Sequence, residues 1–587
     1  MRMIFRLMAV LVVVALPIKA SVLQYNSSTN VERWNFLAPN SSVPTNVLNR
    51  ATHAVRFFLA ADGYSTTNTA AELNAVRAAF AQWQALSNTV VKFEDAGIVN
   101  PPVDINTADG TNVIYWTKTS TLVNGGHDNI SGALGVTFVS FNVPGNEILQ
   151  ADIVLNGYYY SWFTDFFNPN PGNQYFVEDV ALHEIGHFIG LNHSPLGGST
   201  MFYAGDTGVN VTDGLSSDDV AGVRALYSTT PAVFGAIAGS VTLNGSPVVG
   251  AIVTAEDAAS NSFAGTLTWT NGTYALRAMP PGVYRVRISP LDPAGARGVD
   301  ALCTGPDISA AYNNAFTSFP PTTNQSVTVT ANNTNTANFT IVSNVQPFRI
   351  AATRSPTANP GSYSWSSVPV AMTVGQSNYS IGVVSSNLPT SGATFTISGD
   401  GLTLGTPSFL SNPFTSFGVN FISVNISIAS NATPGLRSFI VQKGTNVACA
   451  SGFLKIRPAV LDYNLDGLDD AFQRNYFPLF TATNAAPTSD PDGDGMNNLS
   501  ECIAGTIPTN ASSVFKLLTL TNNRIVGTTV RWLSVSNKVY QVSSRTNLTQ
   551  GAWQNFASTV TATGTNALLL DSAGTNGVRF YRVQVLP

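Results

Sequence analysis

The chain has 587 residues, too many for one hydrophobic core, so we expect several domains. Charged residues make up only 10% of it, against roughly 25% in an average soluble domain. The net charge of −5 argues against nucleic-acid binding, which requires a basic surface. Three cysteines, at 303, 449 and 502, are too few and too far apart for a disulfide scaffold.

Residues 1–20 have the pattern of a secretory signal peptide. Arg2 and Arg6 precede an apolar run, and Ala20 is a small residue at a plausible cleavage point. The run is shorter than the roughly 20 residues that span a bilayer, and no later stretch is long and apolar enough to do so. We therefore expect a secreted protein, extracellular or associated with a cell surface, without a membrane span.

A polar, irregular segment is expected at 21–45, and an α/β unit at 46–228. Within this unit, period-two runs predict strands, and apolar residues at helical spacing predict helices. Thr69 is a candidate N-cap for the first helix. The strands are predicted at 53–60, 90–95, 112–116, 133–142 and 148–156, and the helices at 68–86, 175–191 and 216–228.

After residue 234, short β-like runs alternate with Gly, Pro and Asn turns, which predicts a series of β-sandwiches. The segments GSVTLNGSPVVGAIVTAED and TNGTYALRAMPPGVYRVRISP resemble carboxypeptidase regulatory-like modules. We assign this sandwich and its extension to 234–345. An immunoglobulin-like sandwich is predicted at 346–458, a calcium-binding segment at 459–512 and a last β-module at 513–587.

The sequence HEIGHFIGLNH, from His183 to His193, contains three of the five histidines of the chain. Positions four apart lie on one face of a helix, so His183 and His187 can direct their rings at one point. His193 can join them only if the helix ends and the chain turns back. Gly190 lies where this reversal is needed, and glycine tolerates a positive φ at a helix end.

Three neutral imidazoles suit Zn²⁺ and leave a fourth position for water, as in catalytic zinc sites. Glu184, next to a ligand but off the ligand face, can accept the proton of that water as it attacks a carbonyl. The same carboxylate can pass the proton to the leaving amine. The pattern therefore predicts His183, His187 and His193 as zinc ligands and Glu184 as the general base.

The longer pattern H-E-x-x-H-x-x-G-x-x-H is the signature of metzincin proteases, and the residues after it resemble the matrixin branch. The resemblance implies that Met201, in SPLGGSTMFY, is the methionine of the turn beneath the zinc. It also implies that ALGVTF, at 133–138, is the edge strand that pairs with an extended substrate. Tyr203 follows Met201 by two places, as in the astacin and serralysin branches, where this tyrosine can stabilise the oxyanion; a buried structural tyrosine is the alternative. No cysteine precedes Cys303, so the propeptide cysteine of matrixins is missing.

Two acidic loops resemble the calcium repeats of dockerins and thrombospondin type 3 modules. Together, 462–501 hold eight carboxylates and one basic residue, Arg474, and such a cluster needs a cation to order it. Position 12 of the first loop is Gln473, a poorer ligand than glutamate. The predicted structural Ca²⁺ ligands are Asp490, Asp492, Asp494, Met496, Asn498 and Glu501 in the second loop, and Asp462, Asn464, Asp466, Leu468 and Asp470 in the first.

The expected fold is multidomain: an α/β (α+β) metzincin-type domain with a twisted mixed sheet and a zinc-binding helix, followed by several all-β sandwiches. The expected function is a secreted zinc metalloendopeptidase that acts on extended protein or peptide substrates. The β-modules would hold it near extracellular matrix or a cell-surface polymer. Two alternatives remain open: a non-enzymatic adhesion protein with a relic protease domain, and a calcium-dependent carbohydrate binder built on 346–587.

Overall fold

Two compact units make up the chain, Met1–Ala459 and Val460–Pro587. The predicted signal peptide at 1–20 and Cys303 lie outside the part of the chain that the computed structural model describes. No helix in that part is long and apolar enough to cross a membrane. The described residues are 23, 31–142, 145–168, 174–205, 214–290, 319–356, 363–366, 369–412, 418–575 and 577–586.

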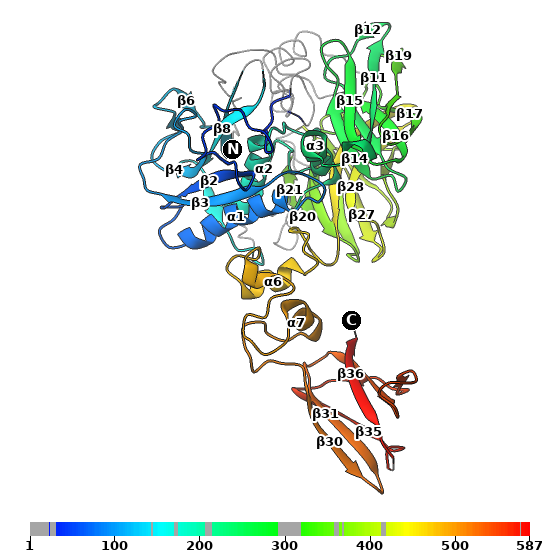
Figure 1. The fold of residues 1–587 in the computed structure, drawn as a ribbon. Helices are drawn as coiled ribbons and strands as arrows, with labels where there is room; N and C mark the ends of the chain where they lie inside the picture. Colours follow the sequence, from blue (N-terminus) through cyan, green and yellow to red (C-terminus); the bar gives the residue numbers. More distant parts are fainter. Residues whose placement is uncertain are drawn as a thin grey trace. The chain divides into compact units, whose positions relative to one another are not determined.

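Domain 1, residues 31–228, is a mixed sheet with helices packed on it (Figure 1). The strand order is β1-β2-β4-β8-β7, and β3 also pairs with β2. Pairing is parallel except at β1–β2 and β7–β8. Its elements are β1 (Leu48–Asn49), β2 (Ala54–Ala60), α1 (Thr69–Gln84), β3 (Phe93–Val99), β4 (Val113–Thr117), β5 (Leu122–Val123), β6 (Asp128–Asn129), β7 (Gly135–Phe141), β8 (Ile148–Asn156), β9 (Ser161–Phe163), β10 (Gln174–Phe176), α2 (Val177–Phe188) and α3 (Ser217–Tyr227).

Alternate residues of the central strand β8 enter two different cores. Ile153 and Leu155 face the helices, in one cluster with Phe80 and Phe188. Val154 lies in the cluster on the other face of the sheet. This alternation follows from the period of two in a strand. It fixes the face of the sheet on which α2, which packs on β7 and β8, is held.

Two local predictions in domain 1 need correction. The N-cap of α1 is Asn68, not Thr69, and Thr69 instead donates from its hydroxyl to the carbonyl of Ser65 at 2.5 Å. Strand β3 does not end at 95 but continues to Val99. Gly97, which reads as a turn residue, has φ +114 within the strand, near a register shift against β2, so it is a bulge rather than an end.

Residues 31–47, expected in part as a polar segment outside the α/β unit, bury apolar side chains in its core. Trp34, Phe36 and Val43 are almost completely buried in the same cluster as α2. The Trp34 indole donates to the carbonyl of Phe188, the last residue of α2, at 2.8 Å. The segment therefore helps to position the end of α2.

Domain 2, residues 231–341, is a sandwich of two sheets, with strand orders β12-β11-β15 and β14-β13-β16-β17; β18 and β19 pair with β11. One core joins both sheets and includes Ile237, Val286 and Phe319. Its elements are η1 (Pro231–Val233), β11 (Gly235–Leu243), β12 (Ser246–Pro247), β13 (Ile252–Glu256), β14 (Ser262–Leu267), β15 (Thr273–Met279), β16 (Gly282–Ser289), β17 (Thr322–Val329), β18 (Thr334–Thr336) and β19 (Phe339–Ile341).

Domain 3, residues 346–459, is a second sandwich, with strand orders β21-β20-β23-β27-β25 and β22-β29-β28-β24; β26 also pairs with β27. Ile381, Ile422 and Phe439 belong to a core shared by the two sheets. Its strands are β20 (Ala352–Pro356), β21 (Tyr363–Ser366), β22 (Val370–Thr373), β23 (Tyr379–Ser385), β24 (Thr394–Ile397), β25 (Leu402–Leu404), β26 (Ser408–Leu410), β27 (Asn420–Ile428), β28 (Gly435–Lys443) and β29 (Asn446–Arg457).

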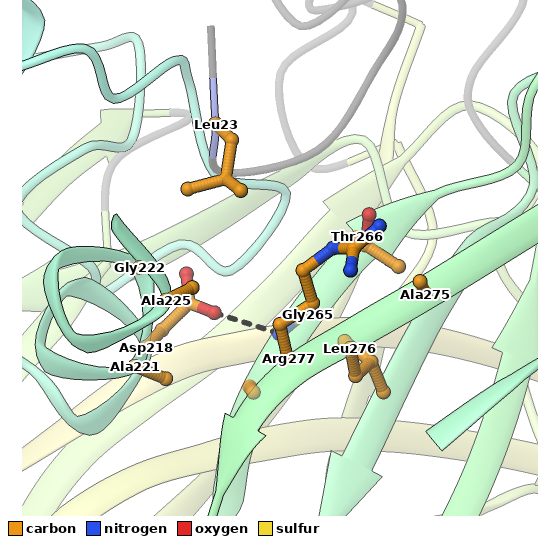
Figure 2. A pocket seen from close by; sticks show the side chains of 11 residues that line it. Leu23, Asp218, Ala221, Gly222, Ala225, Gly265, Thr266, Ala275, Leu276 and Arg277 are labelled. Atoms are coloured by element: carbon orange, nitrogen blue, oxygen red, sulfur yellow. Dashed lines mark hydrogen bonds between the residues drawn. The ribbon is translucent and has the colours of Figure 1, made fainter. Parts of the chain in front are cut away.

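Helix α3 joins domain 1 to domain 2. A carboxylate oxygen of Asp218 accepts from the backbone N–H of Gly265 in β14 at 2.8 Å, and the Ser217 hydroxyl donates to the carbonyl of Phe263 at 2.7 Å. Figure 2 shows the first of these bonds beside a small pocket between α3 and the strands of domain 2. The pocket contains no histidine. Its lining residues are Leu23, Asp218, Ala221, Gly222, Ala225, Ala264, Gly265, Thr266, Ala275, Leu276 and Arg277.

The second unit contains two short helices and a β-module. The strand orders are β30-β31-β35 and β33-β32-β34, and β36 pairs with β32. Trp532 and Tyr540 are buried in its core. The elements are α6 (Asp470–Tyr476), η2 (Thr483–Ala485), α7 (Asn498–Ala504), β30 (Leu517–Asn523), β31 (Gly527–Leu533), β32 (Val539–Arg545), β33 (Gln554–Asn555), β34 (Val560–Thr561), β35 (Asn566–Asp571) and β36 (Phe580–Leu586).

Trp34→Ala tests whether the segment before β1 is part of domain 1. Removing a buried indole and its hydrogen bond should lower the free energy of unfolding by about 3–5 kcal/mol. Urea denaturation, followed by tryptophan fluorescence and by circular dichroism, measures this. Leu37→Ala is the control, because Leu37 lies in the same segment and is exposed. Equal stability of the two variants would contradict the assignment.

Candidate metal centres

The end of helix α2 is where three histidines can meet. His183 and His187 are one turn apart near the end of α2, which stops at Phe188. Gly190 has φ +89, the left-handed conformation expected at the reversal. A Cβ atom at this position would lie 2.3 Å from the carbonyl oxygen of Glu32, so glycine is required here for space as well as for conformation. The chain turns back at this point and brings His193 to the other two.

The three rings present their Nε2 atoms to one another. Nε2 of His187 lies 3.2 Å from that of His183 and 3.1 Å from that of His193. Two nitrogens bound to one tetrahedral zinc ion, each at 2.0–2.1 Å, would be about 3.3 Å apart. Within the described residues, no fourth His, Cys, Asp or Glu joins this group. The donor set therefore fits a zinc ion that keeps one coordination position open.

Backbone carbonyls orient two of the rings. Nδ1 of His183 lies 2.8 Å from the carbonyl oxygen of Thr200, and Nδ1 of His187 lies 2.9 Å from that of Leu191. With a proton on each Nδ1, the two rings donate to these carbonyls, and the lone pair on each Nε2 stays available. Burial lowers the pKa of His183, and burial and the two neighbouring histidines lower that of His187 well below its usual value. Both shifts favour the neutral ring, which is the form that binds a metal.

Glu184 lies between α2 and β7. Its carboxylate oxygen Oε2 accepts a hydrogen bond from the Thr137 hydroxyl at 2.7 Å. A Cβ atom on Gly135, the first residue of β7, would lie 2.8 Å from Oε1, so the strand passes directly over the carboxylate. Burial raises the pKa of Glu184 to about 7, and the bond from Thr137 opposes this rise. A cation beside the carboxylate would lower the pKa again.

Met201 is completely buried against the middle of α2. A Cβ atom on Gly186 would lie 2.1 Å from the Met201 sulfur, so the glycine between the two helical histidines makes room for the methionine. The carboxylate of Asp219, at the start of α3, accepts from the N–H of Thr200 at 2.9 Å and from that of Met201 at 3.1 Å. The turn is therefore tied to α3.

Tyr203 is partly buried and its ring contacts that of Phe202, with centroids 4.7 Å apart. Its predicted role in stabilising the oxyanion stays a prediction. Three residues that sequence reasoning missed act around the site: Thr137, Thr200 and Asp219. Only Asp219 carried a signal, as the N3 residue of the capping box that begins at Ser216.

The second acidic loop brings together more buried oxygen acceptors than there are hydrogen-bond donors for them. The carboxylates of Asp490, Asp492 and Asp494 lie within 4.8 Å of one another. Asp492 Oδ2, Asp494 Oδ2, Asn498 Oδ1 and both carboxylate oxygens of Glu501 are buried without a hydrogen-bond partner. Asn498 and Glu501 are completely buried at the start of α7. Burial, together with the three aspartates, raises the pKa of Glu501 to about 7. Buried acceptors in this arrangement suit a hard cation.

The first acidic loop satisfies more of its carboxylates internally. At position 1 the two loops are alike, because both oxygens of Asp462 accept backbone N–H groups, as do both oxygens of Asp490. The Gln473 amide, at position 12, donates to Asp466 Oδ2 at 2.8 Å instead of offering its oxygen there. Leu468 and Asp470 hold positions 7 and 9 of this loop. Calcium binding by this loop stays a prediction with less structural support than that of the second loop.

Two regions of the chain match models of known protein families. Residues 52–228 match the family model described as Matrixin, and residues 236–299 match that of the carboxypeptidase regulatory-like domain. Among solved structures, the crystal structure of the chicken CNTN1 FN1-FN3 domains matches at 8% sequence identity and a TM-score of 0.13. The match covers 58% of this chain and 84% of that chain, and its TM-score is too low to support an argument.

Three curated relatives are plant metalloendoproteinases of Arabidopsis thaliana. Metalloendoproteinase 4-MMP is 34% identical over 111 residues, which are 18% of this chain and 30% of that protein. Metalloendoproteinase 2-MMP and 5-MMP are 46% and 42% identical over 55 residues, which are 9% of this chain and 14% and 15% of those proteins. The chain thus spans less than a third of the length of each relative. The family matches therefore place a matrixin domain at residues 52–228, followed by a carboxypeptidase regulatory-like domain at 236–299.

Proposed function

We propose that this protein is a secreted zinc-dependent endopeptidase, with His183, His187 and His193 as metal ligands and Glu184 as general base. One observation carries the proposal: three Nε2 atoms converge at zinc-site spacing beside a buried carboxylate. A relic protease domain commonly loses the base or a ligand, and this chain retains all four residues. The proposal of an enzyme is therefore favoured over that of a non-enzymatic adhesion protein.

Glu184 would move the proton during hydrolysis. When bound, zinc polarises the scissile carbonyl and lowers the pKa of a coordinated water to about 7. The Glu184 carboxylate accepts the proton of the attacking water and then delivers it to the nitrogen of the leaving amine. Thr137 holds the carboxylate in place and favours its ionised form. The neutral state of His183 and His187 keeps their Nε2 lone pairs available for the metal.

Strand β7 would bind the substrate. Among the described residues it pairs only with β8, so one of its edges is open for an extended peptide. Gly135, at the start of β7, lies over Glu184, so a peptide paired with this strand would pass close to the general base. An extended backbone fits this edge better than a folded one, because strand addition uses main-chain hydrogen bonds.

We also propose that the second acidic loop binds a structural Ca²⁺. Asp490, Asp492 and Asp494 with Glu501 supply carboxylates, Asn498 an amide oxygen and Met496 a backbone carbonyl. Several buried acceptors without donors would repel one another unless a cation lies among them. Such an ion would stiffen the segment that precedes the C-terminal β-module. The β-modules would keep the enzyme near an extracellular matrix or cell-surface polymer.

Glu184→Gln should keep zinc and lose peptide-bond cleavage. Loss of the base should reduce kcat/KM by at least roughly 10²- to 10⁴-fold. A quenched-fluorescence peptide assay and metal analysis of the same samples measure both properties. Glu178→Gln is the matched control, because Glu178 is also a buried glutamate of α2 but is bonded to Gln82. Retention of activity in the Glu184 variant would refute the base assignment.

Thr137→Val should move the acidic limb of the pH profile. The lost hydrogen bond stabilised the ionised form of Glu184, so the pKa of this carboxyl rises. Since the base works only when ionised, activity should be lost at a pH about one unit higher, given ~1.5 kcal/mol for a bond to a charged group. The pH dependence of kcat/KM tests this, with Ser140→Ala on the same strand as control. If the acidic limb of the pH profile stayed at the same pH or moved to a lower pH, the role of Thr137 would be contradicted.

Asp494→Asn should remove Ca²⁺ binding by the second loop, since it weakens a ligand at its centre. Titration calorimetry of the full chain should show one fewer Ca²⁺ equivalent, and Ca²⁺ should no longer raise the melting temperature of the second unit. Asp462→Asn, at position 1 of the first loop, should leave that equivalent intact. If Asp494→Asn binds Ca²⁺ like the wild type, the second loop is not the site.

A further inference from the structure

Domain 3 contacts domain 1 directly behind the metal centre. The contact is made by residues Ser194–Phe202, called here the Met-turn loop, which connect the third histidine to the buried methionine. The backbone N–H of Gly197 donates to the carbonyl of Ser451 at 3.0 Å, and that of Gly198 to the carbonyl of Gly452 at 2.8 Å. Strand β29, which contains these acceptors, lies more than 200 residues after the histidines. Two of the backbone hydrogen bonds of the loop are therefore made to a strand that is distant in the sequence.

Glycines allow this close approach on both sides. A Cβ atom on Gly197 would lie 2.7–2.9 Å from the Phe453 ring, and one on Gly198 would lie 2.6 Å from Leu436. Gly452 has φ +71, and a Cβ atom there would lie 3.0 Å from Leu196. Contacts of under 3.0 Å would force the two domains apart. The absence of side chains at Gly197 and Gly198 therefore allows the loop to pack against domain 3.

A chain of hydrogen bonds continues from domain 3 to a metal ligand. The buried ammonium group of Lys455, in β29, donates to the carbonyl of Gly214 at 3.0 Å. The hydroxyl of Thr200 donates to the same carbonyl at 3.1 Å. The carbonyl of Thr200 in turn holds Nδ1 of His183. The ring of Phe453 adds an edge contact with that of Phe202, at 5.4 Å between centroids.

We propose that β29 of domain 3 is a positioning element of the zinc site, with Lys455 and Phe453 as positioning residues. The strand would fix the Met-turn loop, and through Thr200 it would fix the orientation of His183. The catalytically competent unit would then extend to residue 457, beyond the end of the matrixin match at 228. This inference rests on the proposed zinc site but not on cleavage itself.

The proposal differs from a tethering role in what it predicts for small substrates. A module that only holds the enzyme near a polymer would leave zinc affinity and the cleavage of a short peptide unchanged. A positioning element affects both, because partners that orient a metal ligand typically change metal affinity by roughly 10- to 100-fold. Zinc retention is therefore the property that separates the two roles.

The test uses Lys455→Met and Phe453→Ala in the full chain. Each should accelerate zinc release to a chelator by roughly 10- to 100-fold and increase amide hydrogen exchange at Gly197 and Gly198. Short-peptide kcat should fall, with a smaller change in KM. Lys455→Arg, which keeps a charged donor, should recover part of the zinc retention.

Two controls separate docking from general stability. Lys443→Met changes an exposed lysine at the end of β28. Phe395→Ala weakens the core of domain 3 at β24, which β28 separates from β29. Both should release zinc like the wild type under native conditions. The proposal would be overturned if Lys455→Met and Phe453→Ala released zinc at the wild-type rate. It would also be overturned if Phe395→Ala accelerated zinc release as much as these variants do, or if the amides of Gly197 and Gly198 exchanged without protection in the wild type. A wild type that binds zinc but cleaves no peptide would refute the proposed function and leave this test intact.

Discussion

The reversal of the chain at Gly190 is the constraint on which the candidate zinc site depends. A continuous helix would carry His193 about 15 Å beyond His183 and turn it away. The left-handed glycine ends α2 and returns the chain, and Glu32 fills the space where a side chain would otherwise stand. Because Trp34 then bonds to the last carbonyl of α2, residues before the first strand also fix where the helix ends.

Around this reversal, most of the site is organised by backbone groups rather than by charged side chains. The carbonyls of Thr200 and Leu191 orient two imidazoles, and Asp219 holds the turn from which the first of these carbonyls comes. Gly186 and Gly135 act through the absence of a side chain, the first under Met201 and the second over Glu184. Such a site needs precise packing, because a carbonyl orients a ring only if its own segment is held.

The convergence of the three histidines could be predicted from sequence because it depends on local spacing. Two histidines one turn apart and a glycine three residues after the second encode their own geometry. The central strands could be predicted for the same reason, since period two is local, whereas the continuation of β3 past residue 95 could not, because it includes a bulge at Gly97. Thr137 and Lys455 could not be found in this way. Their partners lie 47 and 241 residues away, and only the folded chain brings them together.

The most direct measurement is the anomalous diffraction of zinc-loaded crystals at the zinc absorption edge. The account predicts one strong peak about 2.0–2.1 Å from Nε2 of His183, His187 and His193, with a non-protein ligand in the fourth position facing Glu184. A peak elsewhere, rings that do not share one ion, or a fourth protein side chain closing the coordination sphere would contradict it.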